Sequence, residues 1–306
     1  MEQLTASLVA MFGILLLSYG AKQGKLMPAG AHPVLSSLLY NVTSPCLIFT
    51  SLAAGPGLEA LREGLVMVGV AFAYCGIACL LAFFFLRRVP AGDATSGVAA
   101  FSSIFGNTGF MGIPLSYLVF GPPGVVLSTL YDQVHNLFMY TVGVSILGVK
   151  GRNLGETLVR RLREPPLLGF MAGLAVLLSG VTLPDPVLRP VKMLGDTTAA
   201  LAMFTVGQFL VLDGFRRGDR LKKLLLVVSL RLLVFPCAVL GLTSRLPLSP
   251  TVKGVLVIMA ASPTAVMSAV LSQRYGKDYE FAVMAVVTTT ALTVVTMPLI
   301  MSLLGV

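Results

Sequence analysis

GNTGFMGIP, residues 106–114, lies inside a long apolar stretch and decides how this chain folds. Nine residues hold three glycines, an Asn, a Thr and a Pro. Pro114 has no backbone N–H, and the glycines lower the cost of unwinding a helix. We therefore predict a broken helix here. Backbone groups freed within a bilayer must face protein or a watery cavity, so the break predicts an internal site.

Composition shows that this stretch belongs to a membrane protein. Of the 306 residues, 56% are hydrophobic and only 11% are charged. Apolar runs long enough to cross about 30 Å of hydrocarbon recur along the chain. The four cysteines lie in these runs with no His or carboxylate beside them, so we expect neither a disulfide framework nor a metal site.

Hydropathy predicts an all-α polytopic protein with ten transmembrane helices. The connections are short, so any binding must occur within the membrane region. The predicted spans are 4–20, 33–53, 64–86, 97–119, 125–148, 165–181, 191–212, 223–242, 254–273 and 281–303.

The distribution of Lys and Arg predicts the orientation. Connections on one side carry 16 of the 22 Lys and Arg residues, those on the other side carry 5, and Arg231 lies within the eighth span. Because cytoplasmic loops are rich in Lys and Arg, the first side is cytoplasmic and both termini face outward. The net charge of +9 is thereby explained without a nucleic-acid partner.

Ten spans divide naturally into two halves, 1–150 and 151–306. Five spans per half turn the second half upside down, which is an inverted repeat. The fourth span of the second half carries ASPTA, residues 261–265, where the first half carries GNTGFMGIP. Paired interrupted helices at corresponding positions predict a transporter site in which helix N-termini, Asn107 and Thr108 bind an anion.

Several ordered segments resemble the auxin efflux carrier family in its short-loop bacterial form. They are LLYNVTSPCLIF (38–49), GNTGFMGIPL (106–115), YDQVHNLFMYTVG (131–143), LGDTTAALAMFTVGQFL (194–210), AASPTAVMSAVLSQRYG (260–276) and VVTTTALTVVTMPL (286–299). The resemblance implies a fold shared with bile-acid symporters and sodium–proton antiporters.

In that fold, the resemblance implies a scaffold from 4–53 and 165–212, which often dimerises, and a transport domain from 64–148 and 223–303. The transport domain contains two crossover helices and moves like an elevator. The implied substrates are small organic anions, namely auxin in plants and malate or malonate among bacterial relatives. The crossover positions implied for this chain are Asn107 and Pro114 in the first helix, and Ser262, Pro263 and Thr264 in the second.

Ionisable residues at membrane depth are usually functional. Asp132 and His135 share a helix face beside Asn136, and they either couple transport to protons or sodium, line the substrate path, or form a structural pair. Arg231 either snorkels to the headgroups or serves as a counter-charge for a substrate carboxylate.

Three further polar residues, Asn41, Gln208 and Asp196, lie in the second and seventh predicted spans. Asn41 and Gln208 are candidates to complete a substrate pocket, and a plain helix kink at Pro45 is the alternative for the second span. Asp196 is expected to cap the outer end of its helix.

We predict a non-enzymatic, inner-membrane carrier of small organic anions with no bound cofactor. No P-loop is present, so ATP is not the driver. Two alternatives stay open. Tyr131–Asp132 and Gly195–Asp196 resemble the motifs of intramembrane aspartyl proteases, although position 193 is Met where that motif has Gly. A channel or sensor is the other alternative.

Overall fold

The computed structural model describes residues 2–28, 30–53, 58–86, 93–148, 155, 159, 162–209 and 218–303. Within these ranges the regular structure is helical, apart from one isolated β-bridge. Several basic residues used to orient the chain lie outside the described residues, namely Arg87, Arg88, Lys150, Arg152, Arg160, Arg161, Arg216 and Arg217.

The first three predicted spans are helices in the structure. The first is α1 (Glu2–Gln23). The second consists of α2 (Ala31–Leu38), the π-helical turn η1 (Leu39–Thr43) and α3 (Ser44–Ala53). The third is α4 (Leu58–Leu86).

The fourth and fifth predicted spans follow each other directly in the sequence, and the chain turns sharply between them. They comprise α5 (Ala94–Ile104), the π-helical turn η2 (Thr108–Gly112), α6 (Ile113–Phe138), the π-helical turn η3 (Met139–Gly143) and α7 (Val144–Ile146). Within α6, Gly121 has φ 64° and ψ −151°, outside the helical region. Pro122 and Pro123 follow it, so the chain reverses at the predicted connection.

The second half is also helical. It comprises α9 (Pro165–Ser179), α10 (Asp185–Asp196), α11 (Thr198–Phe209), α12 (Gly218–Ser229), the π-helical turn η4 (Leu230–Val234), α13 (Phe235–Ser244), α14 (Pro250–Ala261), α15 (Met267–Arg274) and α16 (Tyr279–Leu303).

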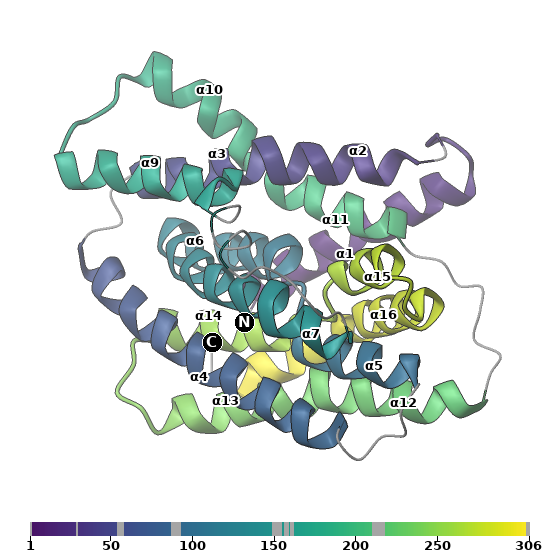
Figure 1. Cartoon of the computed structure of the whole chain (residues 1–306). Helices are drawn as coiled ribbons and strands as arrows, with labels where there is room; N and C mark the ends of the chain where they lie inside the picture. The colour runs from purple at the N-terminus through teal and green to yellow at the C-terminus, as the bar shows by residue number, and fades with distance from the viewer. Residues whose placement is uncertain are drawn as a thin grey trace.

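The helices form layers around the broken ones (Figure 1). Along one side run α2, α3, α9 and α10, and along the opposite side run α4, α12 and α13. Between them lie α5, α6, α14, α15 and α16. The chain thereby buries both predicted breaks in the interior.

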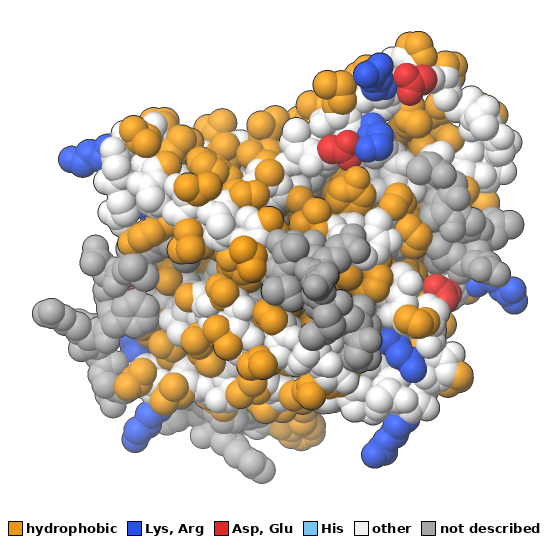
Figure 2. Space-filling model, turned by 180° about the vertical axis from the view of Figure 1, so that it is seen from behind, with side chains coloured by type: hydrophobic (Ala, Val, Ile, Leu, Met, Phe, Trp, Pro, Cys, Tyr) orange, Lys and Arg blue, Asp and Glu red, His pale blue; other side chains and the backbone are white. Residues whose placement is uncertain are grey.

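The surface is that of a membrane protein. Large apolar side chains such as Leu17, Leu65 and Phe84 are 72%, 75% and 60% exposed. Figure 2 shows hydrophobic side chains spread over one face, with Lys and Arg mostly near its periphery. Five described stretches are long and apolar enough to cross a bilayer: Pro33–Ala53, Arg62–Phe84, Thr108–Ile146, Arg220–Ser244 and Tyr279–Leu303. The chain is therefore a multi-pass, all-helical membrane protein.

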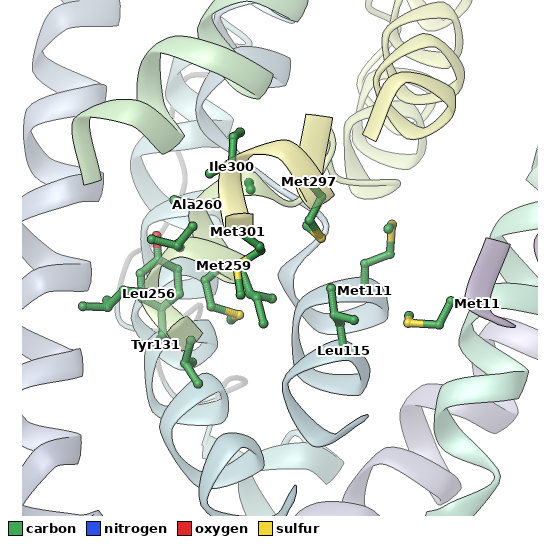
Figure 3. Packing of buried hydrophobic residues seen from close by; sticks show 14 of the residues in the cluster. Met11, Met111, Leu115, Tyr131, Leu256, Met259, Ala260, Met297, Ile300 and Met301 are labelled. Carbon is green, nitrogen blue, oxygen red and sulfur yellow. The ribbon is translucent and has the colours of Figure 1, made fainter. Parts of the chain in front are cut away.

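The interior beside the breaks is filled by flexible apolar side chains. Met111, Met259, Met297 and Met301 pack with Leu115 in one buried cluster (Figure 3). Methionine fills irregular gaps, such as those that interrupted helices leave between them.

Candidate functional site

The two predicted breaks meet in the interior. The first separates α5 from η2, and the second separates α14 from α15. Gly106 and Thr264 form an antiparallel bridge between them. The Asn107 N–H donates to the Pro263 carbonyl at 2.7 Å, and the Ala265 N–H donates to the Phe105 carbonyl at 2.9 Å. Each extended segment therefore satisfies backbone groups that the other helix has lost.

Side chains of the second break hold this crossing in place. Thr264 donates from Oγ1 to the Ser102 carbonyl at 2.9 Å, and its N–H donates to Thr289 Oγ1 at 3.0 Å. Ser262 donates from Oγ to the Ile258 carbonyl at 2.9 Å. Both side chains are fully buried and committed to backbone geometry, so they stabilise the crossing rather than face a cavity.

A cavity of about 90 Å³ lies against one side of the crossing. The crossing contributes residues 106–110 and 265–267, including Asn107 and Thr108. The other walls come from the second span, from Ile113, from residues near the end of the fifth span and from the start of α9: Tyr40, Ser44, Ile48, Ile113, Asp132, Asn136, Met139, Tyr140 and Pro166.

The cavity is lined by residues at the starts of two helices, namely 108–110 of η2 and Met267 of α15. The first N–H groups of a helix have no partner within it and are therefore available to a ligand. Asn107 is 5% exposed, and its Nδ2 has no hydrogen-bond partner among the described residues. A buried unsatisfied amide donor is costly, and an anionic ligand would satisfy it.

Asp132, which lines the cavity, and His135, which does not, belong to one hydrogen-bonded chain. Thr108 donates from Oγ1 to Asp132 Oδ1 at 2.6 Å, and Asn136 donates from Nδ2 to Asp132 Oδ2 at 2.7 Å. The Gly106 N–H donates to His135 Nε2 at 3.2 Å. His135 Nδ1 lies 3.3 Å from Thr108 Oγ1. This assigns the ring proton to Nδ1 and links the imidazole, through Thr108, to the carboxylate.

Besides Ser262 and Thr264, four predicted substrate-binding residues do not line the cavity. Pro114 is the second residue of α6, after η2, so it lies beyond the break. Pro263 contributes its carbonyl to the crossing. Asn41 is exposed and donates to Ser37 Oγ at 3.0 Å. Gln208 donates from Nε2 to the backbone and hydroxyl of Ser18, both at 2.8 Å, and so ties α11 to α1. For these four, a direct contact with substrate stays a prediction.

Arg231 also lies away from the cavity. It is 1% exposed, 13 residues into the helical segment that starts at Gly218, so it does not snorkel to the headgroups as one alternative predicted. Its donors bind main-chain carbonyls and the Tyr74 hydroxyl. A role as a direct counter-charge for substrate stays a prediction without a cavity contact to support it.

Sequence reasoning missed three polar cavity residues, Tyr40, Ser44 and Tyr140, for a geometric reason. Tyr40 and Ser44 recur, with Ile48, every fourth residue and so share one face, whereas Asn41 points to a neighbouring face. The segment LLYNVTSPCLIF was identified from the sequence, but its inward face was not. The same spacing from Asp132 through Asn136 leads to Tyr140, which also lines the cavity.

The two aspartates of the protease alternative are held by different side chains. Asp132 accepts from Thr108 and Asn136. Asp196 accepts from Tyr117 Oη at 3.0 Å and from Lys192 Nζ at 2.7 Å. Asp196 is the last residue of α10, so its carboxylate pairs with these groups instead of capping a helix start as expected.

Comparisons with known proteins agree with a transport function. The family model described as "Membrane transport protein" matches residues 3–301. A protein of Rhizobium meliloti named "Putative malonate transporter" is 27% identical over 305 residues, covering 97% of this chain and 94% of the relative. A protein of Methanothermobacter thermautotrophicus named "Uncharacterized transporter" is 26% identical over 297 residues, with 96% of each chain covered.

Proposed function

The chain belongs to the membrane transport protein family, and we propose that it is a secondary carrier for a small organic anion that binds in the cavity beside the crossing. A monocarboxylate or a short dicarboxylate fits the cavity of about 90 Å³. The relative named for malonate supports a dicarboxylate of this size.

The unpaired amide of Asn107 is the observation that carries this proposal. It lies among the first N–H groups of two helices that start at the crossing. Helix N-termini carry partial positive charge, so this arrangement favours a carboxylate without a Lys or Arg among the residues that line the cavity.

We further propose ten crossings arranged as an inverted repeat. The bridge joins positions 106 and 264, about 160 residues apart, which matches the offset between the first spans of the two halves. The chain would lie in the inner membrane with both termini outside, as a homodimer through the scaffold.

Helix contacts support a division into scaffold and transport domain. In the scaffold, α1 packs on α11, and α3 packs on α9 and α10. In the transport domain, α6 packs on α4 and α14, and α16 packs on α5 and α15. The cavity has walls from both groups, as an elevator mechanism requires, since substrate must bind where the moving part meets the fixed part.

The structure resembles an inward-facing state under the proposed orientation. Tyr40, Pro166 and Tyr140 lie in the cytoplasmic halves of their helices and line the cavity. On the outer side, Leu47, Ile113 and Val125 pack in one buried cluster between the two groups. Substrate would therefore reach the site from the cytoplasm in this state.

Proton coupling is favoured by the carboxylate in the cavity wall. An anion bound near ionised Asp132 would be repelled, and protonation of Asp132 would remove that repulsion. Binding of the anion and of a proton would therefore assist each other, as in a symporter.

Asn107→Ala tests the proposed site. Purified protein in proteoliposomes is supplied with labelled malonate, malate or a monocarboxylate, and initial uptake rates are measured. Hydrogen bonds to charged groups contribute about 1.5–3 kcal/mol, so we expect KM to rise about 10- to 150-fold. The matched control is Ser272→Ala, because Ser272 Oγ is also buried and unpaired but does not line the cavity.

Counterflow separates the carrier from the channel alternative. A carrier accumulates labelled anion against preloaded unlabelled anion, whereas an open pore does not. Unchanged KM in Asn107→Ala would contradict the proposed binding site. Absence of counterflow for anions that the protein conducts would contradict the carrier.

A further inference from the structure

The crossing has a second side, opposite in electrostatic character to the cavity. Helices α5 and α14 both end at the crossing, at Ile104 and Ala261. The last carbonyls of a helix lack intrahelical partners and carry partial negative charge. Two such ends lie together here in the interior, where the protein itself must satisfy backbone groups.

Arg231 occupies this side. Its Nε donates to the Ser262 carbonyl at 2.7 Å, and its Nη1 donates to the Ile104 carbonyl at 3.1 Å. Its Nη2 donates to the Met259 carbonyl at 3.3 Å. One guanidinium therefore binds carbonyls from the ends of both interrupted helices.

The charge of this guanidinium is matched by dipoles rather than by an acid. Its remaining hydrogen bond is from Nη1 to Tyr74 Oη at 2.8 Å, and no carboxylate pairs with it among the described residues. An isolated buried cation is expensive, so it persists only where the surrounding carbonyls stabilise it.

The chain is shaped to admit this group. A Cβ on Gly106 would lie 1.8 Å from Arg231 Nη2, so only glycine permits the approach. Arg231 lies in η4, and a π-helical turn displaces side chains from their ordinary register, often at functional sites. The planar fork of Arg holds five N–H donors in a fixed geometry and so reaches carbonyls spread around its plane, whereas an ammonium has three donors at one point.

We propose that Arg231 is a resident cation of the crossing: it fills a carbonyl cage that would otherwise bind a free monovalent cation. Carbonyl oxygens are the ligands that hard cations prefer, and the cage gathers them from three residues. Removing the side chain leaves a site for guanidinium or an alkali cation. The native carrier then needs no sodium at this position. Of the two measurements that test this inference, only the transport measurement depends on the proposed function.

Chemical rescue tests the proposal. Arg231→Ala is purified and its thermal unfolding is followed while guanidinium, sodium or potassium chloride is titrated at low millimolar concentration, with choline chloride as the ionic-strength control. We expect a lowered Tm that guanidinium, or one of the alkali cations, restores in a saturable manner. Wild type and Arg220→Ala are the controls, because Arg220 pairs with the carboxylates of Asp278 and Glu280 near the surface.

Transport provides the second readout. Arg231→Ala is expected to transport at least about tenfold more slowly than wild type. The cation that restores Tm should also restore the rate. Because unfolding requires no substrate, failure of the anion-site proposal would leave the thermal rescue intact, so the two failures are distinguishable.

Arg231→Lys and Arg231→Met keep the test decisive if the alanine variant does not fold. The two side chains have similar length, and only Lys carries charge. We expect Lys to retain a higher Tm and a faster rate than Met. Three outcomes would each overturn the proposal. The Lys and Met variants could have the same Tm and rate, Arg231→Ala could have the Tm and rate of wild type, or no cation could restore the Tm and rate that Arg231→Ala loses.

Discussion

At the scale of single residues, the cavity joins donors for an anion to one carboxylate. Asp132 is held by Thr108 and Asn136, and it is 6% exposed. A carboxylate in this setting is stabilised by its hydrogen bonds in the ionised form and by a nearby anion in the protonated form. Transport would use the change between the ionised and the protonated form of Asp132, because binding of the anion favours the protonated form.

Asp132→Asn tests this balance. The amide retains the size of the carboxylate but cannot bind or release a proton. We expect anion uptake, followed from about pH 5 to 8, to lose the part of its pH dependence that this carboxylate causes, while the protein stays folded. Uptake is measured across this range in proteoliposomes with matched internal and external pH.

Asp185→Asn is the matched control, because Asp185 is an exposed carboxylate in the first turn of α10. It should keep the wild-type pH profile. If Asp132→Asn keeps that profile too, the carboxylate of Asp132 is structural.

Single residues were predicted unevenly from the sequence. Polar residues at membrane depth are a strong signal of function, so Asn107, Thr108, Asp132 and Asn136 could be predicted from the sequence. All four line the cavity. Ser262 and Thr264 do not line the cavity and their hydroxyl groups bond to backbone carbonyls, so their expected contact with substrate stays a prediction. Composition cannot tell these roles apart, since a hydroxyl serves a ligand and a broken backbone equally well.

At the scale of helices, contacts between neighbours depend on glycines. A Cβ on Gly169 of α9 would lie 2.6 Å from the Pro45 carbonyl oxygen and 2.9 Å from its Cα, both in the backbone of α3. Small residues let membrane helices approach closely, which brings their backbones into van der Waals contact. The pair α3 and α9 forms one wall beside the cavity.

Gly169→Ala should therefore destabilise the protein. Ala favours a helix by about 1 kcal/mol over Gly, but overpacking against backbone costs about 1–3 kcal/mol. The second term dominates, so we expect a lower Tm in detergent. Gly13→Ala, with open space around its Cβ, should leave Tm unchanged or raise it. Equal shifts in the two variants would contradict close packing here.

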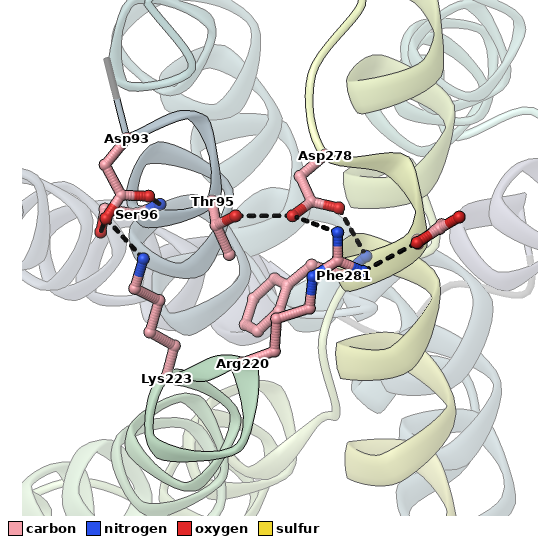
Figure 4. A network of polar contacts seen from close by, with 8 residues as sticks. Asp93, Thr95, Ser96, Arg220, Lys223, Asp278 and Phe281 are labelled. Carbon is pink, nitrogen blue, oxygen red and sulfur yellow. Dashed lines mark hydrogen bonds and ion pairs between the residues drawn. The ribbon is translucent and has the colours of Figure 1, made fainter. Parts of the chain in front are cut away.

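The ends of α5, α12 and α16 are joined by a polar network. Asp93 accepts from the Ser96 N–H at 3.1 Å as the cap of α5, and it pairs with Lys223 of α12. Thr95 and Arg220 both bind Asp278, next to α16 (Figure 4). The hydrogen bond from Lys223 holds the pKa of Asp93 below its ordinary value.

This shift predicts how stability depends on pH. Because the pKa of Asp93 is lower in the folded state, its contribution is present above the unfolded pKa and is lost as pH falls through the folded pKa. We expect Asp93→Asn to lose about 0.5 kcal/mol at pH 6 and less at pH 3, since Asn still caps the helix. Thermal unfolding at the two pH values measures the difference. An equal loss at both would assign the effect to the cap.

The helices themselves were largely predictable. The predicted spans 64–86 and 281–303 correspond to α4 (Leu58–Leu86) and α16 (Tyr279–Leu303). The turn at Gly121 falls between the predicted fourth and fifth spans. The π-helical turns η1 to η4 were not predicted. They depend on which backbone bonds the packed neighbours allow, and an apolar run carries no signal of that.

At the scale of the whole molecule, the sequence predicted that the two interrupted helices would meet, and they do. It did not predict the two unlike sides of the crossing. One side presents helix starts to the cavity, and the other presents helix ends to Arg231. This separation depends on the direction of each half-helix and on the register of η4, which only the assembled fold determines.

The proposed movement of the transport domain relative to the scaffold involves the whole molecule. Tyr117 of α6 and Asp196 of α10 touch across the boundary between them, with Tyr117 Oη 3.0 Å from Asp196 Oδ1. If the transport domain slides past the scaffold, this contact must break in each cycle. A covalent tether at this point should therefore stop transport without touching the cavity, which neither residue lines.

Tyr117→Cys with Asp196→Cys, joined by a short bismaleimide, makes that tether. We expect uptake to fall about tenfold or more, and each single variant treated with the same reagent to stay active. The background replaces Cys46 and Cys237, which are the partly or fully exposed native thiols. Asp93→Cys with Lys223→Cys is the matched pair, since α5 and α12 belong to one group and a tether there replaces an existing ion pair. Full uptake in the Tyr117–Asp196 tether would mean that the two groups move together, and the cavity would then have to open by local rearrangement of its walls.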